Sequence, residues 1–110
     1  MSPAGACPPA RLAWVRFLLP PWAVGQGWPR LVLIRRDQPV RHHRAIAAHE
    51  LAHVRQWRDL GAWRFAAEYA RQWRRYGYDA MPLEGEARAA EYDPAMLACA
   101  AHLLATRPAP

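Results

Sequence analysis

Residues 41–61 read RHHRAIAAHELAHVRQWRDLG, and this stretch decides the fold. No proline or glycine interrupts it before Gly61, which stands where the C-cap of a helix belongs. We therefore predict a helix from about Arg41 to Leu60.

The apolar residues of this helix fall on two sides of a polar pair, His49 and His53. On a helical wheel the residues beside the pair are Ile46 and Trp57, and those on the opposite face are Ala47, Leu51 and Val54. A helix that is apolar on both sides is packed inside a domain and does not lie on its surface.

The sequence before this helix predicts a small sheet. Leu12–Leu19 is a candidate strand, and the β-branched run Arg30–Arg36, which Pro39 ends, is a second one. Residues 20–29 contain prolines and glycines and predict a turn-rich connection. Residues 1–10 are expected to form a loose N-terminal segment.

Three further helices are expected after Gly61. The first runs from about Ala62 to Tyr76, and the second from about Met81 to Tyr92 with Pro82 in its first turn. Asp93 and Pro94 then begin the last helix. The first of these helices carries an aromatic stripe, which we expect to be core packing. The stripe consists of Phe65, Tyr69, Trp73 and Tyr76.

This order of elements predicts an α+β fold, with about two to three strands followed by about four helices and the helix of His49 in the core. The length of 110 residues indicates one domain, residues 1–110.

The charge of the chain bears on which partners it could bind. The net charge of +6 comes from fifteen arginines spread along the chain, without any lysine. No nucleic-acid recognition motif accompanies them, so a solvated basic surface is favoured and nucleic acid is an unlikely partner.

Cys7 and Cys99 lack CxxC spacing and favour a reducing compartment, although a single bridge remains open. Residues 12–19 are too short to span a membrane, so we predict a cytoplasmic protein without a membrane partner.

The segment His49-Glu50-Leu51-Ala52-His53 carries the chemistry. Two histidines at positions i and i+4 project side by side from a helix, so both imidazoles can converge on one zinc ion. Glu50 lies about 100° round the helix, where it can accept a proton from a metal-activated water without binding the metal. The remaining histidines, His42, His43 and His102, are expected to be solvated or structural.

A catalytic zinc site usually has three protein ligands and one open position. Two carboxylates on the helix near residues 81–92, Glu84 and Glu86, are candidates for the third ligand, because that helix could cross the zinc helix. The helical wheel does not choose between them.

These residues resemble the gluzincin clan of zinc metallopeptidases, and especially its very short members, the minigluzincins. Gluzincins carry a glutamate ligand on a later helix, commonly as Glu-x-x-Ala, and Glu84-Gly85-Glu86-Ala87 matches that pattern. The resemblance covers roughly Leu31–Tyr92 and favours Glu84 as the third ligand. It is carried by the zinc-helix motif with Val54-Arg55-Gln56-Trp57, by Phe65 and Tyr69, by Gly77-Tyr78-Asp79 and by Pro82-Leu83-Glu84.

The chain departs from the larger members at one position. Those members often have an acidic residue four positions after the glutamate ligand, where it orients a histidine; here that position is Arg88. The resemblance also implies an edge strand just before the zinc helix. Leu31–Ile34 occupies that place, and an extended peptide could bind there as an added strand.

The function that we expect from this resemblance is a zinc metallopeptidase with one zinc per chain, acting on peptides or unstructured protein. Glu50 would be the general base, and an oxyanion stabiliser is also required. Tyr76, Tyr78, Arg88 and His43 are candidates for that role. The alternatives are a non-catalytic, zinc-containing binding or regulatory module and an arginine-rich nucleic-acid-binding protein.

Overall fold

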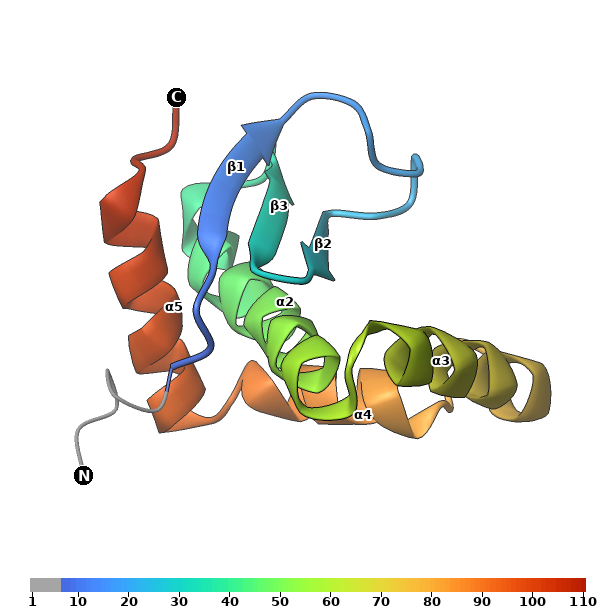
Figure 1. Ribbon diagram of the computed structural model, residues 1–110. Helices are drawn as coiled ribbons and strands as arrows, with labels where there is room; N and C mark the ends of the chain where they lie inside the picture. The colour runs from blue at the N-terminus through green and yellow to red at the C-terminus, as the bar shows by residue number, and fades with distance from the viewer. Residues whose placement is uncertain (1–6) are drawn as a thin grey trace.

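The computed structural model of the chain describes residues 7–110, which form a small sheet followed by helices (Figure 1). This order confirms the expected α+β class. The elements are β1 (Arg11–Val15), β2 (Gly25–Trp28), β3 (Leu31–Arg35), α2 (Val40–Leu60), α3 (Ala62–Tyr76), α4 (Pro82–Ala90) and α5 (Pro94–Thr106). Among the described residues, no helix combines the length and the apolar character that crossing a membrane requires.

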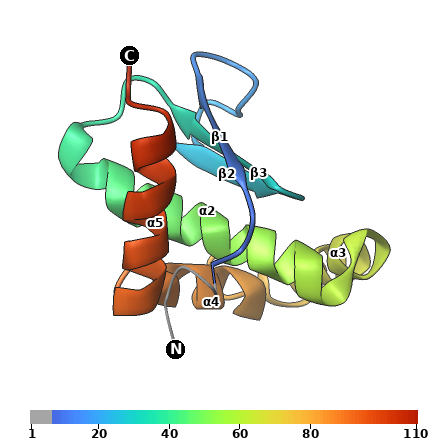
Figure 2. The ribbon, with the colours of Figure 1, turned by 60° about the vertical axis from the view of Figure 1, so that its left-hand side comes forward.

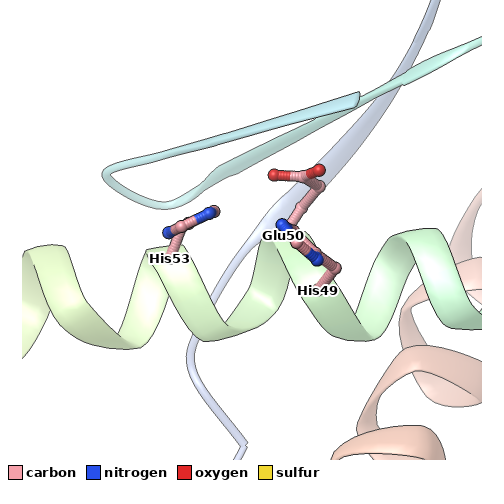
Figure 3. Close-up of side chains that lie close together, drawn as sticks. All are labelled: His49, Glu50 and His53. Atoms are coloured by element: carbon pink, nitrogen blue, oxygen red, sulfur yellow. The ribbon is translucent and has the colours of Figure 1, made fainter. Parts of the chain in front are cut away.

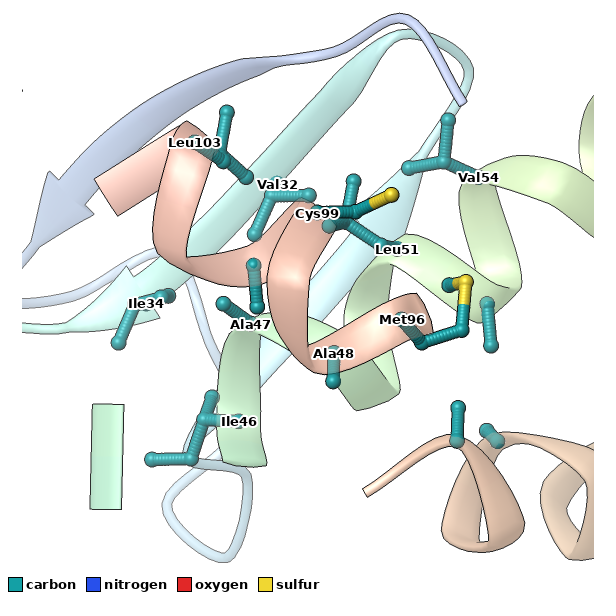
Figure 4. Packing of buried hydrophobic residues seen from close by; sticks show 14 of the residues in the cluster. Val32, Ile34, Ile46, Ala47, Ala48, Leu51, Val54, Met96, Cys99 and Leu103 are labelled. Atoms are coloured by element: carbon teal, nitrogen blue, oxygen red, sulfur yellow. The ribbon is translucent and has the colours of Figure 1, made fainter. Parts of the chain in front are cut away.

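Helix α2 is the central element of the molecule. The sheet lies on one side of it, α5 runs beside it and α4 crosses its other side (Figures 1 and 2). Ala47, Ala48 and Ala52 are fully buried, and their small side chains let neighbouring elements approach α2 closely. Larger apolar residues from the sheet, α2 and α5 complete the core around them (Figure 4). The prediction of a helix packed inside the domain is therefore confirmed.

The sheet has the strand order β1-β3-β2, with β1 parallel to β3 and β2 antiparallel to it. Strand β3 is in the middle, and its residues Val32 and Ile34 are completely buried. The prediction that Leu31–Ile34 forms the edge strand is therefore wrong. The edge strand next to β3 on this side of the sheet is β2, which lies within residues 20–29, the stretch that we predicted to be a turn-rich connection.

Two glycines let β2 lie directly on α2. A Cβ atom added at Gly27 would come within 2.2 Å of the carbonyl oxygen of Glu50 and 2.8 Å of the Cβ of His53. A Cβ at Gly25 would also be crowded, at 3.0 Å from Ile46. The indole Nε1 of Trp57 donates a hydrogen bond of 2.9 Å to the carbonyl oxygen of Gly27 and fastens the strand to the helix.

The N-terminal part of the chain differs from the prediction in two ways. Strand β1 ends at Val15, so residues 16–19 belong to a loop and not to the strand. Cys7 forms a disulfide with Cys99 of α5, and Pro8 is buried, so residues 7–10 are held against the body. The prediction of a loose segment is wrong for these residues, and residues 1–6 lie outside the described part. The free thiols that favoured a reducing compartment are absent, and the cytoplasmic location stays a prediction.

Candidate metal centre

The middle of α2 presents three side chains that could hold a metal ion. His49 and His53 lie one turn apart with ring centroids 5.2 Å from each other, and Glu50 follows directly on the first histidine. Figure 3 shows the three side chains on α2 beneath the β2–β3 hairpin. One ligand atom from each of the three residues lies within 4.8 Å of the others, and this spacing suits a metal centre.

Helix α4 brings a further carboxylate to this group. Its first turn carries Glu84, whose Oε1 lies 3.1 Å from Nε2 of His49 and whose Oε2 lies 3.0 Å from Nε2 of His53. Glu84 is only 2% exposed, whereas Glu86 is exposed to solvent. Glu84 and Glu86 are two residues apart on the helix, which turns by about 200° between them, so their carboxylates point in nearly opposite directions. The crossing of α4 over α2 thus places Glu84, and not Glu86, against both imidazoles.

The other nitrogen of each imidazole also has a partner. Nδ1 of His49 lies 2.7 Å from a carboxylate oxygen of Glu91, and Nδ1 of His53 lies 2.8 Å from the amide oxygen of Gln56. An N–H at Nδ1 that donates to these oxygens orients the ring and directs Nε2 toward Glu84, as oxygen partners do for metal-binding histidines. Glu91, seven residues after Glu84, thus provides an acidic partner for His49, whereas the residue four positions after Glu84 is Arg88.

Buried amides hold the beginning of α4 in place. Gln56 donates through Nε2 to the carbonyl oxygen of Leu83 at 2.9 Å, and the backbone N–H of Leu83 donates to Oε1 of Gln72 at 2.8 Å. The hydroxyl of Tyr69 donates to Oε2 of Glu84 at 2.8 Å. Both glutamines are buried, so these bonds are shielded from water. Together they fix the position of the Glu84 carboxylate from α2 and α3.

The electrostatics of the cluster follow from burial and from the pairing of opposite charges. Burial raises the pKa of Glu50 to about 7, although the two histidines oppose this shift. Burial lowers the pKa of His49, but the hydrogen bond with Glu84 and the charge of Glu50 outweigh it and raise the value to about 9. Burial acts to raise the pKa of Glu84, yet the hydrogen bonds from both histidines hold it below its usual range. Without a cation, the cluster is therefore an ion-pair network that holds protons on its imidazoles.

An open cleft of about 1190 Å³ lies above the cluster. One wall is formed by β2 and the loop before it, and the other by α3 with Phe65, Tyr69 and Trp73. The expectation that the aromatic stripe of α3 is core packing is wrong for most of it. Phe65 is buried, but Trp73 and Tyr76 are 48% and 45% exposed. Trp73 is exposed because it faces the cleft, whereas Tyr76 is the last residue of α3 and does not line the cleft.

The candidates for an oxyanion stabiliser differ in whether they line the cleft. Tyr78 and Arg88 line the cleft. Burial and the negative charge of Glu84 raise the pKa of Tyr78 to about 12, so its hydroxyl keeps a proton to donate. Tyr76 and His43 do not line the cleft, and Nε2 of His43 is engaged with the carbonyl oxygen of Gln38. The geometry thus favours Tyr78 and Arg88.

The sequence did not predict a role at the site for four residues that the structure places around it: Gln56, Tyr69, Gln72 and Glu91. Tyr69 was expected to belong to the core. A local signal existed for Gln56, which lies three residues after His53 on the same helix. The others depend on the crossing of α3 and α4 with α2, which helical periodicity does not reveal.

Comparison of the chain with models of known protein families, with curated proteins and with solved structures finds no match.

Proposed function

We propose that the protein is a zinc-dependent peptidase. The observation that carries this proposal is the convergence of two imidazole Nε2 atoms and the Glu84 carboxylate at the floor of an open cleft, with Glu50 beside them. Two histidines and one glutamate are a donor set of catalytic zinc sites, which leave one position open to solvent. Structural zinc sites are usually closed by four protein ligands, so the cleft favours catalysis.

Zinc bound to such ligands supplies an acidified water and polarises the carbonyl of a peptide bond. The role of Glu50 is to accept a proton from this water at its carboxylate and to pass it to the leaving nitrogen. The role of Tyr78 and Arg88 is to donate hydrogen bonds to the negative charge that develops on the carbonyl oxygen. Glu91 and Gln56 hold the two imidazoles in register for the metal.

The free edge of β2 supports a peptide as substrate. The N–H of Arg35 donates to the carbonyl oxygen of Val24, which makes these residues a hydrogen-bonded pair of the antiparallel ladder. Because such pairs alternate, the backbone groups of Gly25 and Gly27 point away from β3, toward the cleft. Trp57 already occupies the carbonyl of Gly27. An extended peptide could pair with the remaining groups as an added strand, which requires an unstructured or flexible substrate segment.

The test compares wild-type protein with Glu50→Gln after both are loaded with zinc. Elemental analysis should find about one zinc per chain in each, because a catalytic site of this kind holds a single ion. Digestion of a peptide library, followed by mass spectrometry, should show cleavage by the wild type only. His49→Ala should lose both zinc and cleavage.

Two results would end the proposal. A wild-type protein that takes up no zinc would remove its basis. If the wild type binds zinc tightly but cleaves no peptide beyond those that Glu50→Gln also cleaves, the protein is a zinc-containing binding module instead.

A further inference from the structure

The excess positive charge is confined to one part of the molecule. Residues 11–44 contain seven arginines and a single carboxylate, Asp37, whereas residues 45–110 contain eight arginines and eight carboxylates. The arginines are spread along the chain, but the net charge is not. All of it belongs to the sheet, its loops and the first turn of α2.

In the same part of the molecule, the loop between β1 and β2 extends away from the sheet (Figure 1), and several of its apolar side chains are exposed. Phe17, Leu18 and Trp22 are 75%, 78% and 80% exposed. The guanidinium of Arg35 holds the loop from within, because its Nε donates to the carbonyl oxygen of Ala23 at 3.0 Å and its NH2 group to that of Pro20 at 2.8 Å. Large apolar side chains that a braced loop presents to solvent indicate a contact surface.

Exposed arginines lie in or next to this apolar loop or line the same cleft as its Trp22. Arg16 begins the loop and lines a surface hollow together with Arg36, whose backbone N–H bonds to the carbonyl oxygen of Val15. Arg41 lines the cleft together with Trp22. All three arginines are exposed. The surface thus combines exposed apolar side chains of the loop with exposed cationic groups.

We propose that this surface, formed by the loop residues Phe17, Leu18 and Trp22 together with Arg16, Arg36 and Arg41, binds the surface of an anionic lipid membrane. Tryptophan, phenylalanine and leucine partition into the boundary between headgroups and acyl chains. Each arginine near an anionic leaflet strengthens binding by about fivefold. Lipid fits better than nucleic acid, because phosphate contacts explain the arginines but not the exposed Phe17 and Leu18.

This proposal departs from the expectation of no membrane partner, which rested on the lack of a spanning segment. Binding at the surface needs no such segment. Because the loop also forms part of the cleft wall through Pro20 and Val24, bound protein would hold its cleft beside the lipid.

The experiment is co-sedimentation of the full chain with vesicles, at low and at high salt. One set consists of phosphatidylcholine, and the other of equal parts phosphatidylcholine and phosphatidylglycerol. We expect binding to the anionic vesicles alone, weakened by salt. Phe17→Ser, Leu18→Ser and Trp22→Ser combined should weaken binding by about a hundredfold. Arg16→Gln with Arg36→Gln should weaken it by about 25-fold.

Matched controls come from α3, in the charge-balanced part of the chain. Trp63→Ser removes a side chain that is 90% exposed, and Arg64→Gln with Arg75→Gln removes the same charge as the loop pair. These variants should bind vesicles like the wild type, as should Glu50→Gln, which makes the result independent of peptidase activity. Thermal unfolding should be unchanged in the loop and α3 variants, all of which replace exposed side chains.

The proposal is overturned if the wild type fails to bind anionic vesicles at low salt. Equal losses in the loop and α3 variants would overturn it as well, since general charge attraction would then explain the binding. Salt-sensitive binding to a single-stranded oligonucleotide without vesicle binding would replace the lipid by nucleic acid.

Discussion

The contact between β2 and α2 can be tested with one methyl group, by the substitution Gly27→Ala. The new Cβ would lie 2.2 Å from the carbonyl oxygen of Glu50 and 2.8 Å from the Cβ of His53. Neither neighbour is the flexible end of a side chain, so the strand or the helix must move. Either movement would disturb the candidate metal centre, because α2 carries its residues and β2 lies directly over them.

The expected cost follows from these contacts. Overpacking of a close contact costs about 1–3 kcal/mol. If β2 lifts, the hydrogen bond from Trp57 to the carbonyl oxygen of Gly27 is lost as well, at about 1 kcal/mol. We therefore expect a loss of about 2–4 kcal/mol, a large part of the 5–15 kcal/mol by which a small domain is stable.

Urea unfolding of the metal-free protein measures this loss, and Gly85→Ala is the matched control. Gly85 lies inside α4, and nothing lies within 4 Å of a Cβ added there. Alanine is a better helix former, so this control should gain about 0.5–1 kcal/mol. Opposite signs for the two substitutions are the result that the structure requires. A neutral or stabilising Gly27→Ala would refute the close packing of β2 on α2.

Three further predictions concern the metal centre. Glu84→Gln should weaken zinc binding, measured by competition with a chelator, by about a hundredfold or more, whereas Glu86→Gln should leave it unchanged. The reverse result would mean that Glu86, and not Glu84, is the ligand. Glu91→Gln removes the charged partner of His49 Nδ1 and should weaken zinc binding by about 10–100-fold without unfolding the chain. In the metal-free protein, the stability due to His49 should be complete below its ordinary pKa of 6.5 and lost as pH rises through about 9, because folding raises this pKa. The stability due to Glu84, whose pKa folding lowers, should be present above 4.5 and lost as pH falls further. Urea unfolding across this pH range that shows constant stability would contradict both assignments.

The helices could be predicted from the sequence because their signals are local. Gly61 and Gly77 end α2 and α3 with φ of 83° and 78°, a conformation that favours glycine, and the predicted ends agree with the observed ones. Strand β2 could not be predicted in this way. Its sequence Gly-Gln-Gly-Trp has no β-branched residue, and contact with β3 and α2 alone makes it a strand.

The candidate site divides along the same line. The spacing of His49, Glu50 and His53 within one helix was sufficient to bring them together. The choice between Glu84 and Glu86 depends on how α4 crosses α2, and neither residue's position on a helical wheel contains that information. Glu91 is further hidden because it follows the last residue of α4.

The cleft depends on α3, which forms one of its walls. Of the fifteen residues of α3, only Phe65 and Gln72 are buried, so this helix contributes little to the core. Its aromatic face is used instead as a wall of the cleft, opposite β2. The hydrogen bond from the backbone N–H of Leu83 to Oε1 of Gln72 connects that wall to the beginning of α4, and the hydroxyl of Tyr69 connects it directly to Glu84. A displacement of α3 would therefore change the wall of the cleft and the position of the Glu84 carboxylate together. The small size of the domain does not exclude a specific cleft, because one helix serves both as wall and as support for the metal centre.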